Sequence, residues 1–260
     1  MNDYAAALQE AGMSALAAQD KARALEQLRQ AAKRLGFREP LHVFYVPGRI
    51  EVLGKHTDYA GGRSLVCCVE RGLCLISSRR NDRSVRFIDL STNSTAEWEF
   101  TPTSPAAPAS WAIYPATVTR RAAQDFPATQ NGVDVLFLSD LPPAAGMSSS
   151  SALVIASFFA IAAANSLQST EQFQQNLHTQ EDLATYLACV ENGSSFRALS
   201  GDTGVGTFGG SEDHTAILCC EAGKIAQYSF CPVRFERSIT LPDDLTFVIA
   251  TSGVAAEKTG

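Results

Sequence analysis

The spacing of hydrophobic residues changes along the chain and predicts a mixture of helices and strands. Residues 3–36 have apolar and charged positions at helical spacing, and Gly36 is a suitable residue for the end of this helix. Short apolar runs bounded by turn residues predict strands, one of which ends at Pro47. The expected strands span residues 41–47, 64–78 (a pair turning at Arg71-Gly72), 84–90, 132–141, 214–220, 224–230 and 245–252.

Three more helices are expected after the first strands. One begins near Trp111, another is the apolar run 152–164, and a third covers roughly residues 171–192. A polar connection, residues 191–210, follows the third. Because strands come first and helices later, the pattern predicts an α+β layer with a mixed or antiparallel sheet, not a series of βαβ units.

The composition narrows the class of protein. Hydrophobic residues make up 45% of the 260 residues, which is ordinary for a globular protein. The net charge of −6 argues against a general nucleic-acid binder, although a local basic pocket could still hold phosphate. Seven cysteines without C-x-x-C spacing are expected to be buried thiols in a reducing compartment, not disulfides or zinc ligands.

The sequence also indicates where the protein works. The first residues carry charges where a signal peptide needs an apolar core. The longest apolar run, residues 152–164, is shorter than the ~20 residues that span a bilayer. We therefore expect a cytoplasmic protein without a membrane or nucleic-acid partner.

Polar side chains crowd into residues 47–63, PGRIEVLGKHTDYAGGR, directly after an apolar strand. Two basic residues, Arg49 and Lys55, stand near two acids, Glu51 and Asp58. This concentration of charge makes the segment the first candidate for a functional role.

Two glycine-rich nucleotide motifs are not supported by their surroundings. Gly204, Gly206 and Gly209 match the spacing G-x-G-x-x-G, but a polar loop precedes them and a strand-like run follows. A dinucleotide site needs a strand before this motif and a helix after it. Neither Gly-Lys pair in the chain is followed by the serine or threonine that a Walker A loop requires.

The segment AAGMSSSSAL, residues 144–153, favours a phosphate site. Four serines begin an apolar helix, where free backbone N–H groups and the helix dipole attract anions. Serine hydroxyls add donors to phosphate or a ligand to Mg²⁺. An N-cap is the alternative, but it needs only one serine.

Three acids further along are candidates for the same chemistry. Glu191 continues an apolar stripe of its helix, so it would need a cation or a donor, unless it belongs to a solvated helix end. Glu212 and Asp213 come directly before an expected strand, where at most one of them faces a given site. An aspartate beside a cation such as Arg49 could act as a general base. A solvated turn is the alternative.

In this order the motifs resemble those of galactokinases, which belong to the superfamily of galactokinase, homoserine kinase, mevalonate kinase and phosphomevalonate kinase (GHMP kinases). PGRIEVLGKHTDYAGG resembles the galactokinase signature G-R-x-N-x-I-G-E-H-x-D-Y-x-x-G. LPPAAGMSSSSAL resembles the phosphate loop P-x-x-x-G-L-S-S-S-A, and WAIYPATV is similar to the W-x-x-Y segment that precedes it. The resemblance covers roughly residues 40–260.

The resemblance implies a fold and an activity. Residues 1–240 would form the α+β GHMP-kinase N-terminal domain (ribosomal protein S5 domain 2-like), with 1–38 as a helical extension. Residues 241–260 would begin a ferredoxin-like C-terminal domain, so we expect a piece of a longer protein. The implied activity is that of a monomeric kinase that uses ATP and Mg²⁺ to phosphorylate a sugar at its anomeric hydroxyl.

The resemblance also implies a role for each candidate residue. Asp213 and Arg49 would form the catalytic pair, while Ser150 and Glu191 would bind Mg²⁺. The residues implied to contact the sugar are Glu51, Lys55, His56 and Asp58. The residues implied to wrap the triphosphate are Gly146, Met147, Ser148, Ser149, Ser150 and Ser151.

The sugar-binding motif departs from the family pattern. Lys55 replaces a glutamate, Glu51 replaces an asparagine, and E-D-H at 212–214 replaces M-D-Q. Lysine donates hydrogen bonds where glutamate accepts them, so we expect a sugar other than galactose, for instance a uronic acid. Alternatively, Lys55 pairs structurally with Glu51.

A non-catalytic sugar and ATP sensor is the second functional hypothesis. A mevalonate or homoserine kinase is disfavoured, because H-T-D-Y resembles a feature of the sugar kinases of the superfamily.

Overall fold

The computed structural model of the chain describes residues 3–104, 110–128, 131–142, 146–242, 244–245 and 247–248. Its described elements are, in chain order, α1 (Tyr4–Glu10), α2 (Ala15–Arg34), β1 (Leu41–Leu53), the 3-10 turn η1 (Asp58–Ala60), β2 (Arg63–Arg79), β3 (Ser84–Asp89), β4 (Ser94–Glu99), α3 (Ile113–Asp125), β5 (Val133–Ser139), α4 (Ser149–Asn165), the 3-10 turn η2 (Leu167–Ser169), α5 (Glu171–Asn176), α6 (Gln180–Asn192), α7 (Glu212–Cys219), β6 (Lys224–Ser229) and β7 (Arg234–Thr240).

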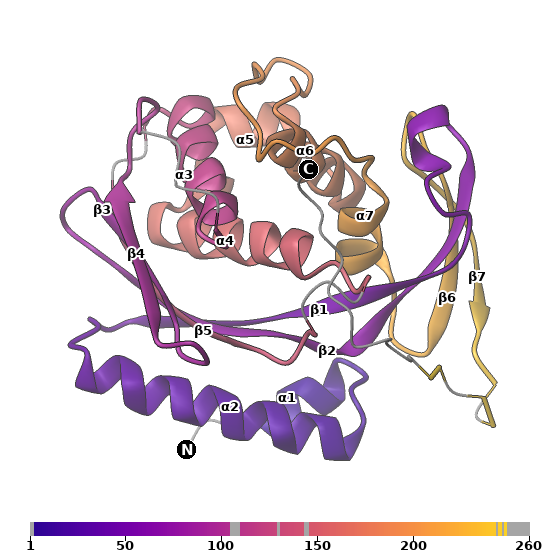
Figure 1. Cartoon of the computed structure of the whole chain (residues 1–260), viewed down its shortest axis with the longest axis horizontal. Helices are drawn as coiled ribbons and strands as arrows, with labels where there is room; N and C mark the ends of the chain where they lie inside the picture. The colour runs from indigo at the N-terminus through magenta and orange to yellow at the C-terminus, as the bar shows by residue number, and fades with distance from the viewer. Residues whose placement is uncertain are drawn as a thin grey trace.

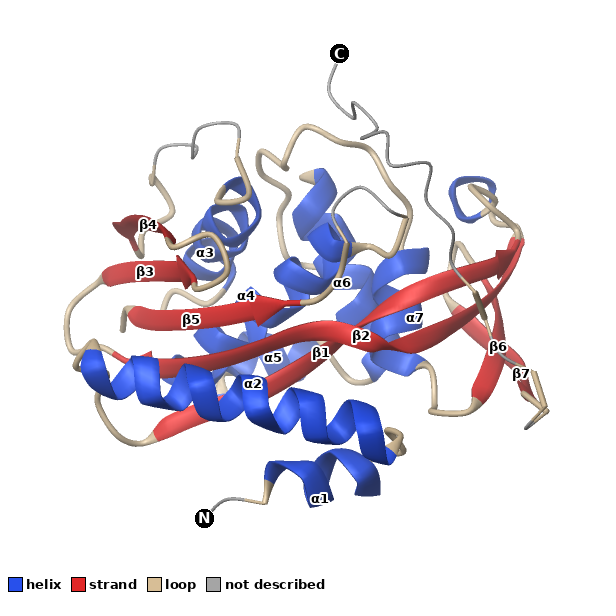
Figure 2. Cartoon of the chain, turned by 60° about the horizontal axis from the view of Figure 1, so that its bottom comes forward, coloured by secondary structure: helices blue, strands red, loops and turns tan. Residues whose placement is uncertain are grey.

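One sheet of seven strands runs through the described residues. Its order is β4-β3-β5-β2-β6-β7, and β1 pairs along β2. Strands β3 and β5 are parallel, whereas the other neighbours are antiparallel. Helices α1 and α2 cover one face, and α3, α4 and α6 cover the other (Figure 1, Figure 2). This arrangement confirms the expected α+β class with a mixed sheet.

The main core lies between the sheet and the layer of α3, α4 and α6. Helix α4 is apolar on nearly all sides and is buried over most of its length, as a central helix must be. A smaller core joins α2 to the opposite face of the sheet. There Lys21, which is 5% exposed, forms an ion pair with Asp140 just after β5. A buried ammonium group needs such a partner, so α2 is fixed to the strand end that leads toward α4.

Strands β1 and β2 are longer than the sequence suggested. We expected an end at Pro47, but β1 continues past it, with a register shift between Pro47 and Arg49. Such an irregularity accommodates proline, which has no N–H to give to the ladder. We also expected a turn at Arg71-Gly72, but β2 is unbroken. A Cβ at Gly72 would lie 2.4 Å from Val46 O, so this glycine permits close approach of two strands instead of a turn.

Two expected helices are each divided in two. The segment 3–36 breaks between α1 and α2, after which Gly36 follows α2 with φ of 75°, as a residue after a helix end often does. The segment 171–192 breaks between α5 and α6. Thr179 begins α6 there, because its Oγ1 accepts a hydrogen bond from the Asp182 N–H at 3.1 Å.

The segment 214–220 was expected to be a strand but is mostly helix α7. Its apolar run is short, and periodicity does not separate a buried strand from two helical turns. As a result, Glu212 and Asp213 both stand in the first turn of a helix. Strands β4 and β7 were not expected; β7 is exposed along its whole length and therefore lacks an apolar signal.

Some expectations fall beyond these elements. The strand expected at 245–252 and the second domain expected at 241–260 lie largely outside the described residues. All seven cysteines are free thiols, and Cys231 is exposed where we expected burial. None of the described helices combines the length and apolar character that crossing a membrane requires.

Candidate active site

The N-terminus of α4 has hydrogen-bonding groups without partners. Ser148 occupies the N-cap position with φ of 55°, yet its side chain makes no capping hydrogen bond. Its Oγ is buried, makes no well-formed hydrogen bond among the described residues and lies beside the Asp213 carboxylate. Capping therefore does not account for these serines. The N–H groups of the first turn and the helix dipole remain available to an anion.

Arg49 joins three segments that are far apart in the sequence. Its Nε donates to Asp213 Oδ1 at 2.7 Å, and its Nη2 lies 2.5 Å from the same oxygen. Its Nη1 donates to Gly146 O at 2.6 Å, and its backbone N–H donates to Met147 O at 3.4 Å. Strand β1 thus holds the serine segment and the first turn of α7 together.

Asp213 is an ionised carboxylate that remains accessible. Burial acts to raise the pKa of its carboxyl, but the positive charge of Arg49, together with the nearby Ser148 hydroxyl and the hydrogen bond from Arg49, lowers the pKa below its usual value. The side chain is still 33% exposed. A carboxylate that is charged, fixed in orientation and open on one side can orient a substrate hydroxyl and accept its proton.

Ser151 connects Asp213 with Glu191. Its Oγ lies 3.2 Å from Glu191 Oε2 and 3.5 Å from Asp213 Oδ2, so the two carboxylates share one hydroxyl proton. On the other side, Nε2 of the buried His214 lies 3.1 Å from Glu191 Oε2. Glu191 is therefore part of an inward-facing polar cluster and does not sit at a solvated helix end.

The oxygen atoms around Glu191 suit Mg²⁺. This ion is usually held by one or two carboxylates together with substrate phosphates, not by a cage made only of protein. Glu191 offers a carboxylate, and among the described residues no group of three or more His, Cys, Asp or Glu side chains is arranged to hold a metal ion alone. The hydroxyl beside Glu191 is that of Ser151. Ser150 lies instead near the phenol of Tyr114, whose pKa is raised by burial and by Glu191.

A compact turn, residues 54–62, joins β1 to β2 away from the core (Figure 1). Its shape is fixed by Thr57, whose Oγ1 lies 2.8 Å from Gly54 O and 2.9 Å from Arg63 O. A Cβ at Gly62 would lie 2.6 Å from the Thr57 side chain, so the turn closes tightly on this threonine.

Lys55 and His56 are exposed on this turn. The His56 ring stacks on the Tyr59 ring with centroids 5.7 Å apart. None of the ion pairs within the described parts of the chain involves Lys55. These two side chains are therefore available to a ligand but do not touch Arg49 or Asp213.

Asp58 is buried and already hydrogen-bonded. Its Oδ1 accepts from the Tyr59 N–H at 3.1 Å, and its Oδ2 accepts from the Glu212 N–H at 3.2 Å. A Cβ at Gly210 would lie 1.8 Å from Oδ2, so the backbone there must be glycine to pass the carboxylate. This expected sugar contact therefore also anchors the first turn of α7, next to Asp213.

Glu51 faces Glu212, not Lys55. Glu212 is 4% exposed, and its Oε2 accepts from Ser64 Oγ at 2.6 Å. Burial is the main cause that raises the pKa of Glu212, to about 8, and the carboxyls of Glu51 and Asp58 add to it.

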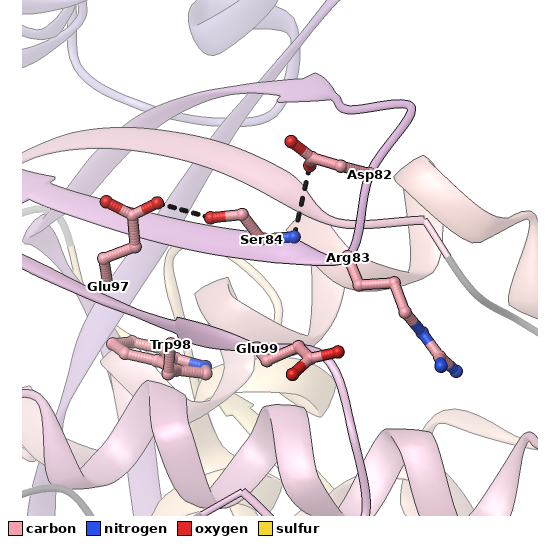
Figure 3. A pocket seen from close by; sticks show the side chains of 6 residues that line it. All are labelled: Asp82, Arg83, Ser84, Glu97, Trp98 and Glu99. Atoms are coloured by element: carbon pink, nitrogen blue, oxygen red, sulfur yellow. Dashed lines mark hydrogen bonds between the residues drawn. The ribbon is translucent and has the colours of Figure 1, made fainter.

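Two surface hollows lie away from these residues. One, of about 350 Å³, is lined by Asp82, Arg83, Ser84, Glu97, Trp98 and Glu99 (Figure 3). The other, of about 420 Å³, is lined by Gly36, Arg38, Arg79, Arg80, Asn81, Asp82, Arg86 and Asp134. Neither contains a residue that the sequence placed in the site.

Two family matches cover the segments that build this site. Residues 32–79 match the galactokinase galactose-binding signature, and residues 114–210 match the GHMP kinases N terminal domain. The chain thus carries a galactokinase galactose-binding signature followed by a GHMP-kinase N-terminal domain. The two matches contain Arg49, the serine segment and Glu191, but both end before Asp213.

Curated relatives of this chain include bacterial galactokinases. The galactokinase of Actinobacillus pleuropneumoniae (serotype 5b, strain L20) is 30% identical over 111 residues, which is 43% of this chain and 29% of that protein. The galactokinase of Bacillus subtilis (strain 168) is 32% identical over 124 residues, covering 47% of this chain and 32% of that protein. The matched part is thus about a third of the length of these relatives.

Solved GHMP kinases share the fold. The chain matches Lactococcus lactis galactokinase complexed with galactose at a TM-score of 0.65 and 21% identity, covering 85% of this chain and 52% of that one. It matches Methanococcus jannaschii mevalonate kinase at a TM-score of 0.55 and 13% identity, covering 77% and 57%. These matches confirm the expected GHMP-kinase N-terminal fold.

The sequence reasoning found only part of this arrangement. It named Arg49, Asp213 and Glu191, which the structure brings together with the serines. It missed His214, although the E-D-H departure was a visible signal that the surroundings of Asp213 differ. It also missed the contact between Glu51 and Glu212, since no pattern in a single sequence reveals that two acids far apart meet.

Proposed function

We propose that the chain forms the ATP- and sugar-binding part of a kinase that transfers the γ-phosphoryl group of Mg-ATP to a sugar hydroxyl, the anomeric one as in galactokinase-like enzymes. The observation that carries this proposal is the Arg49–Asp213 pair, which stands beside the uncapped N-terminus of α4. The two family matches and the relatives named galactokinase support it.

Each polar group then has a role in phosphoryl transfer, which depends mainly on positioning and on neutralising charge. The N–H groups and hydroxyls from Ser148 to Ser151 bind the phosphates. Glu191 and the hydroxyl beside it would hold Mg²⁺, which when bound neutralises phosphate charge. Asp213 accepts the hydrogen bond of the sugar hydroxyl and takes its proton while the new P–O bond forms and ADP leaves.

Arg49 contributes in two ways. Its charge keeps Asp213 ionised, and its contact with Gly146 O fixes the distance between that carboxylate and the phosphate-binding segment. Such fixed geometry lowers the entropic cost of bringing hydroxyl and phosphate together.

We also propose that the sugar carries an acidic substituent, as a uronic acid does. Lys55 is exposed, and its sequence neighbour Glu51 is directed to Glu212, so the alternative Lys55–Glu51 ion pair does not form among the described residues. An unpaired ammonium group at a sugar-binding turn favours an anionic ligand over a neutral hexose.

ATP consumption with Mg²⁺ and a panel of neutral and acidic sugars tests both statements. We expect sugar-dependent ADP formation, with a uronic acid preferred, and a loss of ~10²–10⁴-fold in Asp213→Ala. The matched control is Glu99→Ala, which removes an exposed carboxylate on β4 (Figure 3). A clear preference for galactose would refute the charge argument. Tight binding of ATP and sugar without turnover would favour the non-catalytic sensor.

A further inference from the structure

The Arg49–Asp213 pair is accompanied by a second contact between β1 and α7. Glu51 lies two positions after Arg49 on β1, and residues so spaced project from the same face of a strand. Glu212 directly precedes Asp213 in the first turn of α7. The carboxyl of Glu51 lies against that of Glu212, so both residues of this turn contact the same strand.

The surroundings of Glu212 determine in which protonation state it can form a hydrogen bond with Glu51. Its Oε2 is occupied by Ser64 Oγ, while its Oε1 is buried without a hydrogen-bond partner among the described residues. The neighbouring group, Glu51, is another carboxyl. Two ionised carboxylates offer only acceptors, so they hydrogen-bond each other only when one of them carries a proton.

We propose that Glu51 and Glu212 share one proton and act as a positioning pair, which holds the first turn of α7 on β1 so that Asp213 stays against Arg49. The effect on turnover rests on the proposed kinase function, whereas the proton-sharing contact does not. Glu51 and Glu212 are the two positions near the catalytic pair where this chain carries acids in place of the Asn and Met of the galactokinase pattern. The two acids that depart from the galactokinase pattern therefore contact each other.

The groups that face Glu212 come from several elements. Glu51 belongs to β1, Asp58 and Tyr59 to η1, Ser64 to β2, and Asp213 to α7 itself. Arg49, two residues before Glu51, is engaged by Asp213. Glu212 has no ion pair within the described residues, and retaining a proton is the way to limit repulsion among these carboxyls.

The contact between Glu51 and Glu212 is expected to weaken at alkaline pH. The pKa of Glu212 is raised from its ordinary 4.5 to about 8, chiefly by burial. The folded protein thus binds this proton more tightly than the unfolded chain does. The stabilisation is complete below pH 4.5 and is lost as the pH rises through about 8, where two charged carboxylates repel each other. Above that pH we expect α7 to shift from β1 and Asp213 to leave its position.

Glu212→Gln tests the pair, because the amide donates to Glu51 without titrating. Equilibrium unfolding in urea, from pH 5 to 9.5 and without substrate, is the first measurement. We expect the unfolding free energy of the unaltered protein to fall toward alkaline pH and that of Glu212→Gln to fall much less. Glu51→Gln should behave in the same way from the other side, and Glu99→Gln should follow the unaltered protein.

The pH profile of kcat is the second measurement. We expect the kcat of the unaltered protein to fall above about pH 8 and the alkaline limb of Glu212→Gln to move up by at least one pH unit, with an unchanged KM for ATP.

If both Gln variants keep the original pH dependence of unfolding, the carboxyls do not share a proton. If unfolding changes as expected but the kcat profile does not, the pair does not position Asp213. Absence of turnover with every sugar would contradict the kinase function alone, and the unfolding data would still decide the contact.

Discussion

The start of α4 leaves polar groups open, whereas the polar groups that close the turn 54–62 are already hydrogen-bonded. At the start of α4, the buried Ser148 hydroxyl lies beside the Asp213 carboxylate, and the helix has no side-chain cap. In the turn, Thr57 and Asp58 are engaged by neighbouring backbone groups. In the first region the N–H groups of the helix start are open to an anion, whereas in the second the polar groups of Thr57 and Asp58 are already engaged.

This difference separates two tasks. Under the proposed function, phosphate binding would depend on backbone groups whose arrangement is set by the fold, so it would tolerate little change. Sugar choice would depend on the exposed side chains of Lys55 and His56, which stand on a turn closed by other residues. Arg49 lies between the two regions, because it contacts both Gly146 and Asp213.

The largest effect is expected from Arg49→Lys, which disturbs both regions. Lysine keeps the charge but cannot bind Asp213 and Gly146 O together, so both shift relative to each other. We expect kcat to fall by about 10²-fold, the size of effect that a misplacement of ~1 Å produces. Steady-state kinetics measure it, and the exposed Arg83→Lys is the control (Figure 3). Unchanged kcat would mean that Arg49 is not the link between the regions.

Gly210→Ala should disturb the turn but leave the start of α4 intact. Its Cβ would meet Asp58 Oδ2 and push this carboxylate away from α7. We expect a loss of about 1–3 kcal/mol in the free energy of unfolding, as for other overpacked sites, and a higher KM for the sugar. Gly209→Ala is a close control, since its Cβ would meet only Asn192 Oδ1 at an ordinary 3.8 Å. Equal stability of the two variants in urea would show that the turn is less rigid than its contacts indicate.

Ser148→Ala should affect ligand binding without harming the fold. The variant removes a buried hydroxyl that makes no well-formed hydrogen bond and only approaches Asp213, so the free energy of unfolding should change by less than about 1 kcal/mol. We expect the Kd for ATP to increase by about tenfold, the value of one hydrogen bond to a charged group. Ser157→Ala, which removes a hydroxyl bonded within α4, should not change the Kd in calorimetry. Unaltered ATP affinity in Ser148→Ala would place the phosphates elsewhere.

Lys55→Glu should have the smallest effect on stability and still change which sugars the protein prefers. Lys55 is exposed and has no ion pair within the described residues, so we expect a stability change within about 0.5 kcal/mol. The ratio of kcat/KM for acidic over neutral sugars should fall, by about tenfold for one lost charge-assisted contact. Lys33→Glu on α2 controls for the change in net charge. An unchanged ratio would show that Lys55 does not contact the sugar.

The sequence predicts those parts of the molecule whose signal is local. The apolar run after the serines indicated α4, and the order of motifs indicated the pairing of Arg49 with Asp213. The unbroken passage of β2 through Gly72 was not predictable, because a glycine that permits close strand approach looks like a turn residue. Helix α7 was mistaken for a strand for a similar reason: its short apolar run gains helical character only from packing. The contact of Glu51 with Glu212 depends on tertiary folding and leaves no local trace.

The continuous ribbon of β1 and β2 has a consequence for protein engineering. Since both strands extend from the core directly into residues 54–62, this loop can be replaced as a cassette without cutting through the core. A graft must retain Thr57 and Asp58, which close the loop and hold α7, while position 55 is open to randomisation and position 56, with φ of 60°, favours residues such as Gly, Asn and Asp. If the proposed function holds, a library of that design would explore new sugar acceptors while the start of α4 stays unchanged.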